Sequence, residues 1–379
     1  MRTRRVLFLL SADFGEFVTA RLFSRGQPFQ ACFALPERLS GYAAGQRESI
    51  SLYRNEADVT QIVSQFRPDL VLLCSGYLFT VNRLLSLESL QALLGALVGA
   101  GIKVATTDPW LRIWALRADA RFRIRSVRRG GVDAAATEAV TSLQRRLEQC
   151  FSGIAHVFAV PIAPAREDWL SFFNPRFSGQ GRGILQAEQA GGDHWVFVLG
   201  REDLTLFAAG DEPRFLETLQ QRLADVLALP GNRATFIGPP PVCAYLERGQ
   251  AAGGRLRVMP FCDFDTFEQI IGEASMVVYW NILSASLLYC LYFRTPAVCF
   301  WRGHQATVCE GLEEHVIAQV YCGKPPPMID FASPIEARAA ELSRRFAIPA
   351  WIESIRGTYE RLPEPQAIVE RLIMDDARV

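Results

Sequence analysis

The sequence predicts an α/β protein with two Rossmann-like parallel-sheet domains that face an interdomain cleft. Two observations lead to this prediction. Short apolar runs alternate with helical patterns through the first third of the chain, and the same alternation restarts near residue 195. Repeated strand–helix–strand units form right-handed crossovers, which build parallel sheets covered by helices on both faces. The length of 379 residues also exceeds one ordinary domain of about 100 to 200 residues.

The first domain is expected over residues 1–163. Its expected strands are apolar runs bounded by charged or turn-forming residues, at 6–10, 29–35, 70–74, 103–107 and 156–160. Its expected helices have apolar residues at helical spacing, near 16–24, 56–66, 87–98 and 134–150. Prolines and glycines then interrupt the pattern, so a linker or mobile loop is expected over residues 164–192.

The second domain is expected over residues 193–345 and repeats the pattern. Its strands are expected at 195–199, 234–237, 257–261, 276–280 and 297–301. Helices are expected near 213–227, 242–248, 266–274 and 284–293, and further helices near 334–346, 349–361 and 364–374. Residues 346–379 therefore form a C-terminal helical segment in this prediction.

Composition and charge exclude several classes of protein. Hydrophobic residues make up 50% and charged residues 21%, which excludes a disordered chain. Forty basic and forty acidic residues cancel, so no global field favours nucleic acid as a partner. The nine cysteines are scattered without Cys-x-x-Cys pairs, which favours a reducing cytoplasm and argues against structural zinc. The four histidines are too dispersed for a metal site, and the N-terminal apolar run is too short for a signal peptide.

One uncharged stretch, residues 275–293, is nineteen residues long and could in principle cross a bilayer. Asn281, Ser284 and Ser286 interrupt it, and it divides into a β-type run, a polar turn and a helical run. A proline-marked β-type run follows it. This pattern is typical of a buried parallel-sheet unit rather than of a membrane span.

Ligands of open parallel sheets bind beyond the carboxyl ends of the strands, so the loops there are the candidate sites. The loop after the first strand reads Ser11-Ala-Asp-Phe-Gly-Glu16 and places Asp13, Gly15 and Glu16 at a helix start. Either carboxylate would be suited to accept a proton from an attacking group. Acidic residues at this position also complement the helix dipole, so capping is the alternative reading of both.

Two loops of the second domain are candidate donor-binding loops. Backbone amides at the start of the helix near residue 284, with Asn281 and the hydroxyls of Ser284 and Ser286, would suit a diphosphate. In the next loop, Arg302 would suit a phosphate, and His304 or Gln305 a sugar hydroxyl. The alternative readings are an ordinary serine cap and a solvated polar loop.

Other well-known site motifs are absent from the sequence. Gly-x-Gly-x-x-Gly follows neither domain's first strand, which makes NAD and FAD unlikely ligands, and neither a P-loop nor a Gly-x-Ser-x-Gly elbow occurs. Residues 112–129 carry seven arginines against one acid, Asp119. This run and the aromatic loop at residues 169–175 are candidates for acceptor contact or peripheral membrane contact, and a solvated face is the alternative for the run.

Residues 263–305 resemble the donor-binding region of the peptidoglycan N-acetylglucosaminyltransferase, and residues 276–305 also resemble the protein-arginine rhamnosyltransferases. Both families belong to the GT-B superfamily. The shared features are a strand ending near Val278, a polar loop, a helix, a strand marked by Pro296, and the His304-Gln305 loop. The resemblance implies the GT-B-like arrangement of two Rossmann-like domains. In it, residues 1–163 form the acceptor domain, and residues 193–345 form the nucleotide-sugar domain, which binds most of the nucleotide sugar.

The first-domain loop is similar to the acidic loop that carries the catalytic carboxylate of the rhamnosyltransferases. In this match Glu16 takes the place of the loop's second acid, Ala12 stands where the first would be, and Asp13 is displaced by one residue. The families also carry an acid near the start of the donor helix. Here the segment reads Ile282-Leu-Ser-Ala-Ser286, and only Ser286 matches.

The leading hypothesis is an inverting, metal-independent glycosyltransferase that uses a nucleoside-diphosphate sugar as co-substrate and needs no cofactor. Glu16 is the first choice for the base and Asp13 the second. The acceptor, a hydroxyl or amine on a small molecule, glycan, lipid or peptide, is not fixed by the sequence. One alternative is a nucleotide-sugar epimerase, which would isomerise donor alone. The other is a non-catalytic protein that binds a nucleotide sugar or a protein partner without turnover.

Overall fold

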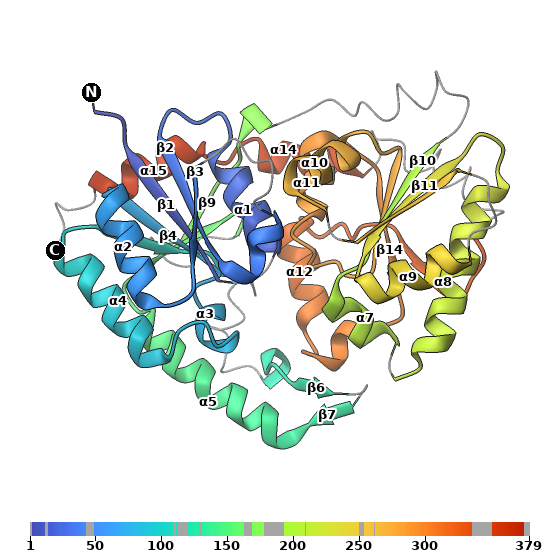
Figure 1. Ribbon diagram of the computed structural model, residues 1–379, viewed down its shortest axis with the longest axis horizontal. Helices are drawn as coiled ribbons and strands as arrows, with labels where there is room; N and C mark the ends of the chain where they lie inside the picture. The colour runs from blue at the N-terminus through green and yellow to red at the C-terminus, as the bar shows by residue number, and fades with distance from the viewer. Residues whose placement is uncertain are drawn as a thin grey trace. The chain divides into compact units, whose positions relative to one another are not determined.

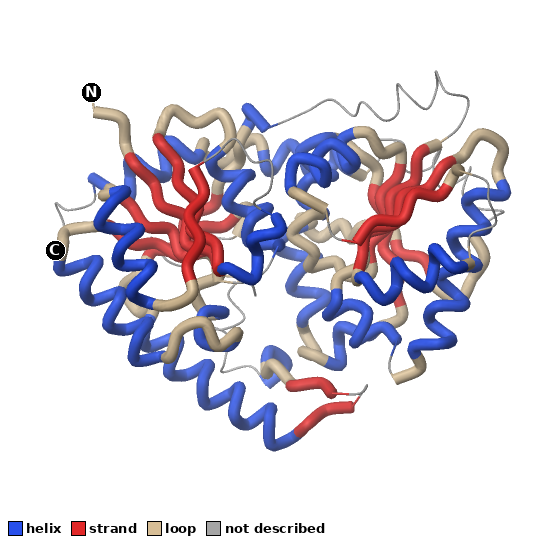
Figure 2. The backbone as a smooth tube through the Cα atoms, in the orientation of Figure 1, coloured by secondary structure: helices blue, strands red, loops and turns tan. Residues whose placement is uncertain are grey.

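The chain folds into two compact units, each built around one parallel β-sheet. The computed structural model describes residues 2–11, 14–42, 49–108, 111, 120–128, 131–162, 169–177, 193–208, 210–249, 254–260, 262–335 and 351–374. Unit 1 comprises Met1–Arg117, Ser142–Phe177 and Thr358–Val379, and unit 2 comprises Ala118–Thr141 and Ser178–Gly357. Helices lie on both faces of each sheet, as Figures 1 and 2 show. This arrangement confirms the α/β class with two Rossmann-like sheets.

Unit 1 contains a seven-stranded sheet in the order β3-β2-β1-β4-β5-β8-β9, and every pairing in it is parallel. Its strands are β1 (Arg5–Leu10), β2 (Gln30–Pro36), β3 (Ser49–Tyr53), β4 (Leu70–Cys74), β5 (Lys103–Thr106), β8 (Ala155–Phe158) and β9 (Trp169–Ser171). Its helices are α1 (Phe14–Ser24), α2 (Glu56–Phe66), α3 (Leu78–Val81), α4 (Leu87–Gly99) and α15 (Pro365–Met374), with 3-10 turns η1 (Glu37–Tyr42) and η4 (Pro175–Phe177).

Unit 2 contains a six-stranded parallel sheet in the order β12-β11-β10-β13-β14-β15. Its strands are β10 (His194–Val198), β11 (Arg233–Gly238), β12 (Leu256–Pro260), β13 (Met276–Tyr279), β14 (Ala297–Trp301) and β15 (Met328–Asp330). Its helices are α7 (Arg201–Ala208), α8 (Glu212–Ala228), α9 (Pro240–Arg248), α10 (Phe264–Gly272), α11 (Leu287–Phe293) and α12 (Leu312–Val320), with the 3-10 turn η5 (His304–Thr307).

The remaining elements lie at the places where the chain passes between the units. A two-stranded antiparallel ribbon, β6 (Ser126–Arg128) and β7 (Gly131–Asp133), follows the 3-10 turn η3 (Ala120–Phe122). Helix α5 (Ala134–Cys150) begins in unit 2 and ends in unit 1, and α14 (Ile352–Tyr359) begins in unit 2 and ends in unit 1.

Both sheets reverse their strand order at one position, and this position fixes where a ligand crevice forms. In unit 1 the chain turns from β1 toward β2 on one side and later to β4 on the other. In unit 2 the same reversal lies between β10 and β13. Connections leave such a pair of neighbouring strands in opposite directions, and the crevice beyond their carboxyl ends is the usual ligand site of open parallel sheets.

An aromatic core supports the carboxyl ends of the strands in unit 2. The ring centroids of Trp280 and Phe300 lie 5.1 Å apart, and Phe331 lies 4.9 Å from Phe300. Phe207 of α7 and Phe215 of α8 each lie 5.2 Å from Phe331. Aromatic pairs at these separations add stabilisation beyond the apolar area they bury. The cluster therefore holds the last residues of β13, β14 and β15 against α7 and α8.

Helix α11 is held at its C-terminus by a buried side chain. Arg356 of α14 donates from Nη1 to the carbonyls of Leu291 and Tyr292 at 2.6 and 3.1 Å. A cation at this end also complements the helix dipole. The short helix is thus fixed in place beside β13.

Most elements match the sequence prediction, and the differences have local causes. Helices α2 and α5 and strands β4 and β14 have the predicted bounds. The polar, alternating edge strand β3, the three-residue strands β9 and β15, and helices α7 and α12 were not predicted. Helix α11 begins at Leu287 rather than Ser284 because residues 281–286 form turns. The predicted helix near residues 334–346 lies almost wholly outside the described residues.

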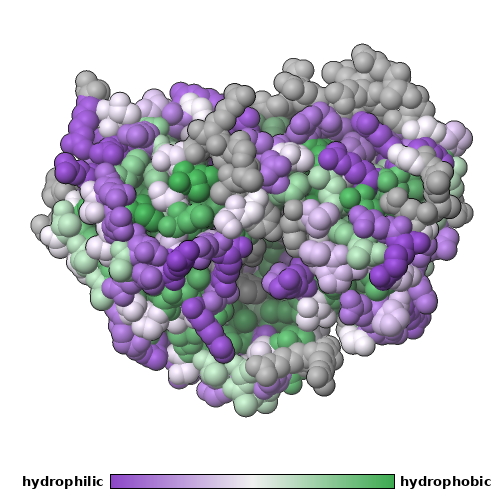
Figure 3. Space-filling model, in the orientation of Figure 1, coloured by the Kyte–Doolittle hydropathy of each residue, from purple (hydrophilic) through white to green (hydrophobic). Residues whose placement is uncertain are grey.

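None of the helices in the described parts of the chain has the length and apolar character that a bilayer crossing requires. The uncharged stretch at residues 275–293 forms β13, a turn and α11. Figure 3 shows charged and polar side chains spread among hydrophobic ones on one face of the molecule. The exposed large hydrophobic residues of the described chain are Leu52, Val81, Val98, Val132 and Met374.

A pair of glycine substitutions tests the packing of unit 1. A Cβ at Gly76 would lie 2.6 Å from both the Phe151 ring and the Thr106 hydroxyl oxygen. We expect Gly76→Ala to lower the free energy of unfolding by roughly 1–3 kcal/mol through overpacking. The control Gly95→Ala, at an α4 position with no atom within 4 Å of the added Cβ, should raise it by roughly 0.5–1 kcal/mol. Urea unfolding measures both, and equal effects would contradict this account.

Candidate functional site

The candidate site of unit 2 consists of the loops after β13 and β14. Side chains alternate between the two faces of a strand. Met276, Val278 and Trp280 belong to the core cluster that contains α8, whereas Tyr279 contacts Cys290 of α11. By this alternation Asn281, one residue beyond Trp280, lies on the same side of the sheet as Tyr279, the α11 face. The same alternation assigns Val298 and Phe300 of β14 to the α8 face.

A direct hydrogen bond joins the two loops. The Gln305 amide Nε2 donates to Asn281 Oδ1, and the same oxygen accepts from the Leu283 amide at 2.7 Å. Gln305 is 3% exposed, and its Oε1 has no protein partner in the described chain. The structure thus brings together two residues that the sequence placed on neighbouring loops. An unsatisfied buried carbonyl oxygen is costly and is well placed to accept a ligand hydroxyl.

His304 anchors the β14 loop to the end of β13. Its Nε2 lies 2.8 Å from the Trp280 carbonyl oxygen, so this nitrogen carries the proton that it donates. The imidazole is buried between Phe207 and Trp301, whose ring centroids lie 4.5 and 5.2 Å away. The pKa of His304 is lowered to about 4, mainly by burial and less by the positive charge of Arg302, while the bond to the Trp280 carbonyl opposes the shift. This histidine therefore holds the loop in place and is neutral at pH 7.

Backbone amides at the end of the turn between Asn281 and α11 donate hydrogen bonds to carbonyls of the same segment. The amides of Leu287, Leu288 and Tyr289 donate to the carbonyls of Ser284, Ala285 and Ser286 at 2.9, 3.1 and 3.0 Å. These three amides are engaged within the turn and the start of α11. The hydroxyls of Ser284 and Ser286 lie 2.8 Å apart and bond to each other. Ser284 and Asn281 are half-buried, and Ser286 is buried.

Tyr321 is a further part of this site that the sequence did not reveal. Its hydroxyl donates to the Ile282 carbonyl at 2.7 Å and holds the turn from the end of α12. The residue is separated from Ile282 by 39 positions. No local pattern signals such a contact, because the contact depends on how α12 folds back over the loop.

Arg302 does not join the polar residues Asn281, Ser284, Ser286 and Gln305, the Asn281 cluster. It continues the α8 face of β14, and its guanidinium carbon lies 4.5 Å from the Phe207 ring centroid. Burial lowers the pKa of Arg302, and the charge of Arg214 on α8 adds to this effect. The sequence grouped Arg302 with His304 and Gln305, but the structure places its side chain in a separate pocket.

In unit 1, Glu16 lies in the first turn of α1, next to the end of β1. It is 4% exposed. The Ser11 amide donates to Oε2 at 2.7 Å, and the Ser11 hydroxyl donates to Oε1. Both bonds tie the start of α1 to the end of β1. The structure therefore gives Glu16 a linking contact between strand and helix and leaves a role as base to be tested.

The surroundings of Glu16 show the effect of its charge. Burial raises the pKa values of Tyr53 and Cys74 well above their usual range, and the Glu16 carboxylate raises both further. The Tyr53 hydroxyl donates to the Leu10 carbonyl. Gly15 is half-buried in the same helical turn, and its carbonyl accepts from the Thr19 hydroxyl at 3.2 Å. Asp13 lies outside the described residues.

No group of three or more histidine, cysteine, aspartate or glutamate side chains gathers with metal-binding geometry in the residues that the structure describes. Part of the arginine-rich run is described. Arg123 pairs with Glu138 at 2.6 Å, and Arg125 lies 4.0 Å from Glu310. Arg112, Arg117 and Arg129 fall outside the described residues.

Comparison with known proteins identifies the fold. No family model and no curated protein matches the sequence. The solved structure of the spinosyn rhamnosyltransferase SpnG matches with a TM-score of 0.55 and 14% identity, covering 97% of this chain and 99% of that chain. The calicheamicin glycosyltransferase CalG4 matches with a TM-score of 0.52 and 13% identity, covering 98% of each chain. The chain therefore has the GT-B fold of these glycosyltransferases.

The buried imidazole of His304 makes stability depend on pH. The unfolded side chain binds a proton below its ordinary pKa of 6.5, whereas the folded one binds it only near pH 4. The unfolded state therefore holds more protons between these values, and the free energy of unfolding must fall as pH is lowered through this window. At about 1.4 kcal/mol per pKa unit, the loss is of the order of 3 kcal/mol by pH 4.

The variant His304→Gln keeps a donor for the Trp280 carbonyl but cannot titrate, so we expect its unfolding free energy to fall less between pH 7.5 and 4.5. Urea unfolding at both pH values measures the difference. His194, whose pKa burial also lowers to about 4, contributes equally to both proteins. An unchanged pH dependence in the variant would rule out this account of His304.

Proposed function

We propose that the protein is a GT-B glycosyltransferase that transfers a sugar from a nucleoside-diphosphate sugar to a small-molecule acceptor. The observation that carries the proposal is the Asn281–Gln305 pair beside the Ser284 and Ser286 hydroxyls, at the carboxyl ends of β13 and β14. These groups lie on the α11 side of the strand-order reversal, where open parallel sheets bind their ligands.

Structures of SpnG support the donor and acceptor classes. SpnG complexed with thymidine diphosphate matches this chain with a TM-score of 0.52, and SpnG complexed with spinosyn aglycone matches with 0.53. We therefore propose a nucleoside diphosphate as the leaving group here and a hydroxyl-bearing or amine-bearing small molecule as the acceptor. The binding screen described below identifies the sugar and the nucleobase.

The hydroxyls of Ser284 and Ser286 are proposed to contact the diphosphate. One of their two protons makes the hydrogen bond between them, and the other is available to a ligand. Fixed donors aimed at developing negative charge stabilise a departing diphosphate without reorganisation. We propose that these donors act without a cofactor and without a metal ion. The Gln305 carbonyl oxygen is proposed to accept a hydroxyl of the sugar or ribose.

Glu16 is proposed as the base that deprotonates the acceptor. Its carboxylate sits at the carboxyl end of β1, beside the strand-order reversal of unit 1. Direct attack by a deprotonated acceptor is a single displacement and inverts the anomeric centre. To take a proton, Glu16 must exchange the Ser11 hydroxyl for the acceptor group while its bond from the Ser11 amide remains.

The donor proposal predicts selective nucleotide binding. Among UDP, dTDP, GDP and CMP, we expect one nucleoside diphosphate to raise the melting temperature, because a ligand of the folded state stabilises it by mass action. Ser286→Ala should weaken that binding about tenfold, since a hydrogen bond to a charged group contributes roughly 1.5–3 kcal/mol. Calorimetry with and without EDTA measures the affinity and tests metal independence.

The matched control is Ser64→Ala, at an exposed serine of α2 that bonds only to the Gln61 carbonyl. It should bind the nucleotide as the parent protein does. Equal affinities for both serine variants, or no binding of any nucleotide, would remove the proposed donor site.

The base proposal predicts a kinetic effect of Glu16→Gln. A positioned base contributes roughly 10²–10⁴-fold, so kcat should fall by that factor while nucleotide affinity stays unchanged. Product analysis by NMR should show inversion at the anomeric carbon. The amide can still accept from Ser11, which limits the structural loss.

Turnover at the parental rate, together with lower stability, would leave Glu16 as a capping residue only. Donor binding with no turnover in the parent protein would instead indicate a non-catalytic member of the fold.

A further inference from the structure

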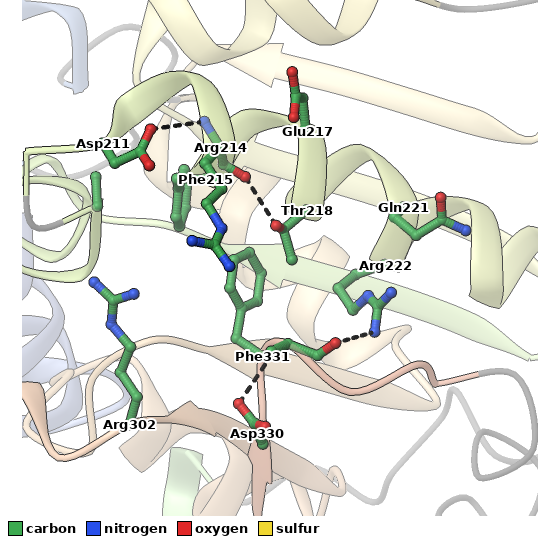
Figure 4. A pocket seen from close by; sticks show the side chains of 12 residues that line it. Asp211, Arg214, Phe215, Glu217, Thr218, Gln221, Arg222, Arg302, Asp330 and Phe331 are labelled. Atoms are coloured by element: carbon green, nitrogen blue, oxygen red, sulfur yellow. Dashed lines mark hydrogen bonds between the residues drawn. The ribbon is translucent and has the colours of Figure 1, made fainter.

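Unit 2 contains a pocket on the other side of the sheet from the Asn281 cluster. It has a volume of about 630 Å³ and opens between the first half of α8, the end of α7 and the carboxyl ends of β14 and β15. Figure 4 shows the side chains that line it, among them Arg214, Arg222, Arg302 and Asp330. Its size is within the range of small-molecule sites, roughly 300–1,000 Å³.

Two arginines in this pocket have no acidic partner among the described residues. Arg214 extends from the first turn of α8, and Arg302 extends from the loop after β14. Figure 4 shows the two side chains reaching toward one another across the pocket. Their like charges interact, and the Arg302 side chain lies against the Phe207 ring, which fixes its plane. A guanidinium stacked in this way keeps its N–H edge available for hydrogen bonds.

The acidic residues of the pocket are engaged elsewhere. Asp211 caps α8 by accepting from the Arg214 backbone amide at 3.2 Å. Asp330 accepts from the Ala332 amide at 3.0 Å and from the Ser333 hydroxyl at 3.3 Å. The Glu217 side chain points away from the two arginines in Figure 4.

The third arginine of the pocket is also engaged. Arg222 is buried, lies 3.2 Å from the Asp225 carboxylate, and donates to the Ala332 carbonyl at 3.5 Å. Arg214 and Arg302 are therefore the arginines of the lining that have no ion-pair partner among the described residues.

We propose that this pocket binds the phosphoryl group of a small ligand between Arg214 and Arg302. A phosphoryl dianion matches two positive charges and has enough oxygens to engage both guanidinium forks. The first turn of α8 adds the positive end of its dipole. The inference concerns a site separate from the proposed donor loop and does not depend on it.

Calorimetry on the full chain tests the proposal at constant ionic strength. The probes are inorganic phosphate, glucose 1-phosphate and the nucleoside diphosphate selected by the screen, so that free phosphate, a sugar phosphate and a nucleotide are distinguished as sources. We expect phosphate-containing probes to bind the parent protein, and Arg214→Gln and Arg302→Gln to weaken inorganic phosphate at least tenfold. The matched control Arg201→Gln, at an exposed arginine of α7 outside the pocket lining, should bind as the parent does.

Folding and site identity are checked in the same series. Arg214→Gln removes one of two like charges and should retain the parental melting temperature in chloride buffer, and Arg214→Lys should recover part of the phosphate affinity. Ser286→Ala should leave inorganic phosphate binding unchanged. Equal phosphate affinity of Arg214→Gln and Arg201→Gln, or no phosphate binding to the parent, would overturn the proposal. It would also be overturned if Arg214→Gln and Ser286→Ala weakened the same nucleotide alike, because the pocket would then be part of the donor site.

Discussion

The aromatic cluster of Trp280, Phe300 and Phe331 is the contact on which the sites of unit 2 depend. Each of these rings lies at or just beyond the carboxyl end of a different strand, and their centroids are separated by 4.9 to 6.1 Å. Interiors of this density transmit small displacements, because few voids exist to absorb them. A change in one ring would therefore move the loops after β13 and β14 together. The polar groups of these loops take their positions from an apolar support.

The same support explains why the loops are rigid although they carry polar side chains. His304 bonds to the backbone of Trp280, Gln305 bonds to Asn281, and Tyr321 bonds to the backbone of Ile282. Each bond satisfies a group that would otherwise be buried without a partner, which costs about 1–3 kcal/mol. The atoms left over, above all Gln305 Oε1, are consequently few and fixed. Preorganised groups of this kind are what a binding site for a charged leaving group requires.

The sequence predicted the elements whose signal is local and missed contacts that only the fold creates. Helix α2 and strand β4 were predicted with their bounds because helical periodicity and a continuous apolar run suffice for each. Strand β3 was missed because its serines make an edge strand look like a loop. The burial of Glu16 depends on Ser11 turning back toward α1, and the use of the Leu287 amide depends on a turn at Ser284. Neither contact leaves a periodic trace in the sequence.

The separation of Arg302 from Gln305 follows from the alternation of side chains between the two faces of a strand. Val298 and Phe300 face α8, and a period of two places Arg302 on that same side. Residues 304–307 then form a 3-10 turn, and within this turn Gln305 is brought back to Asn281 on the α11 side. A four-residue stretch thus serves both faces of one sheet edge. Grouping the loop residues by proximity in sequence joined side chains that the strand's alternation directs apart. For this reason one loop contributes Arg302 to the pocket beside α8 and Gln305 to the polar cluster at Asn281.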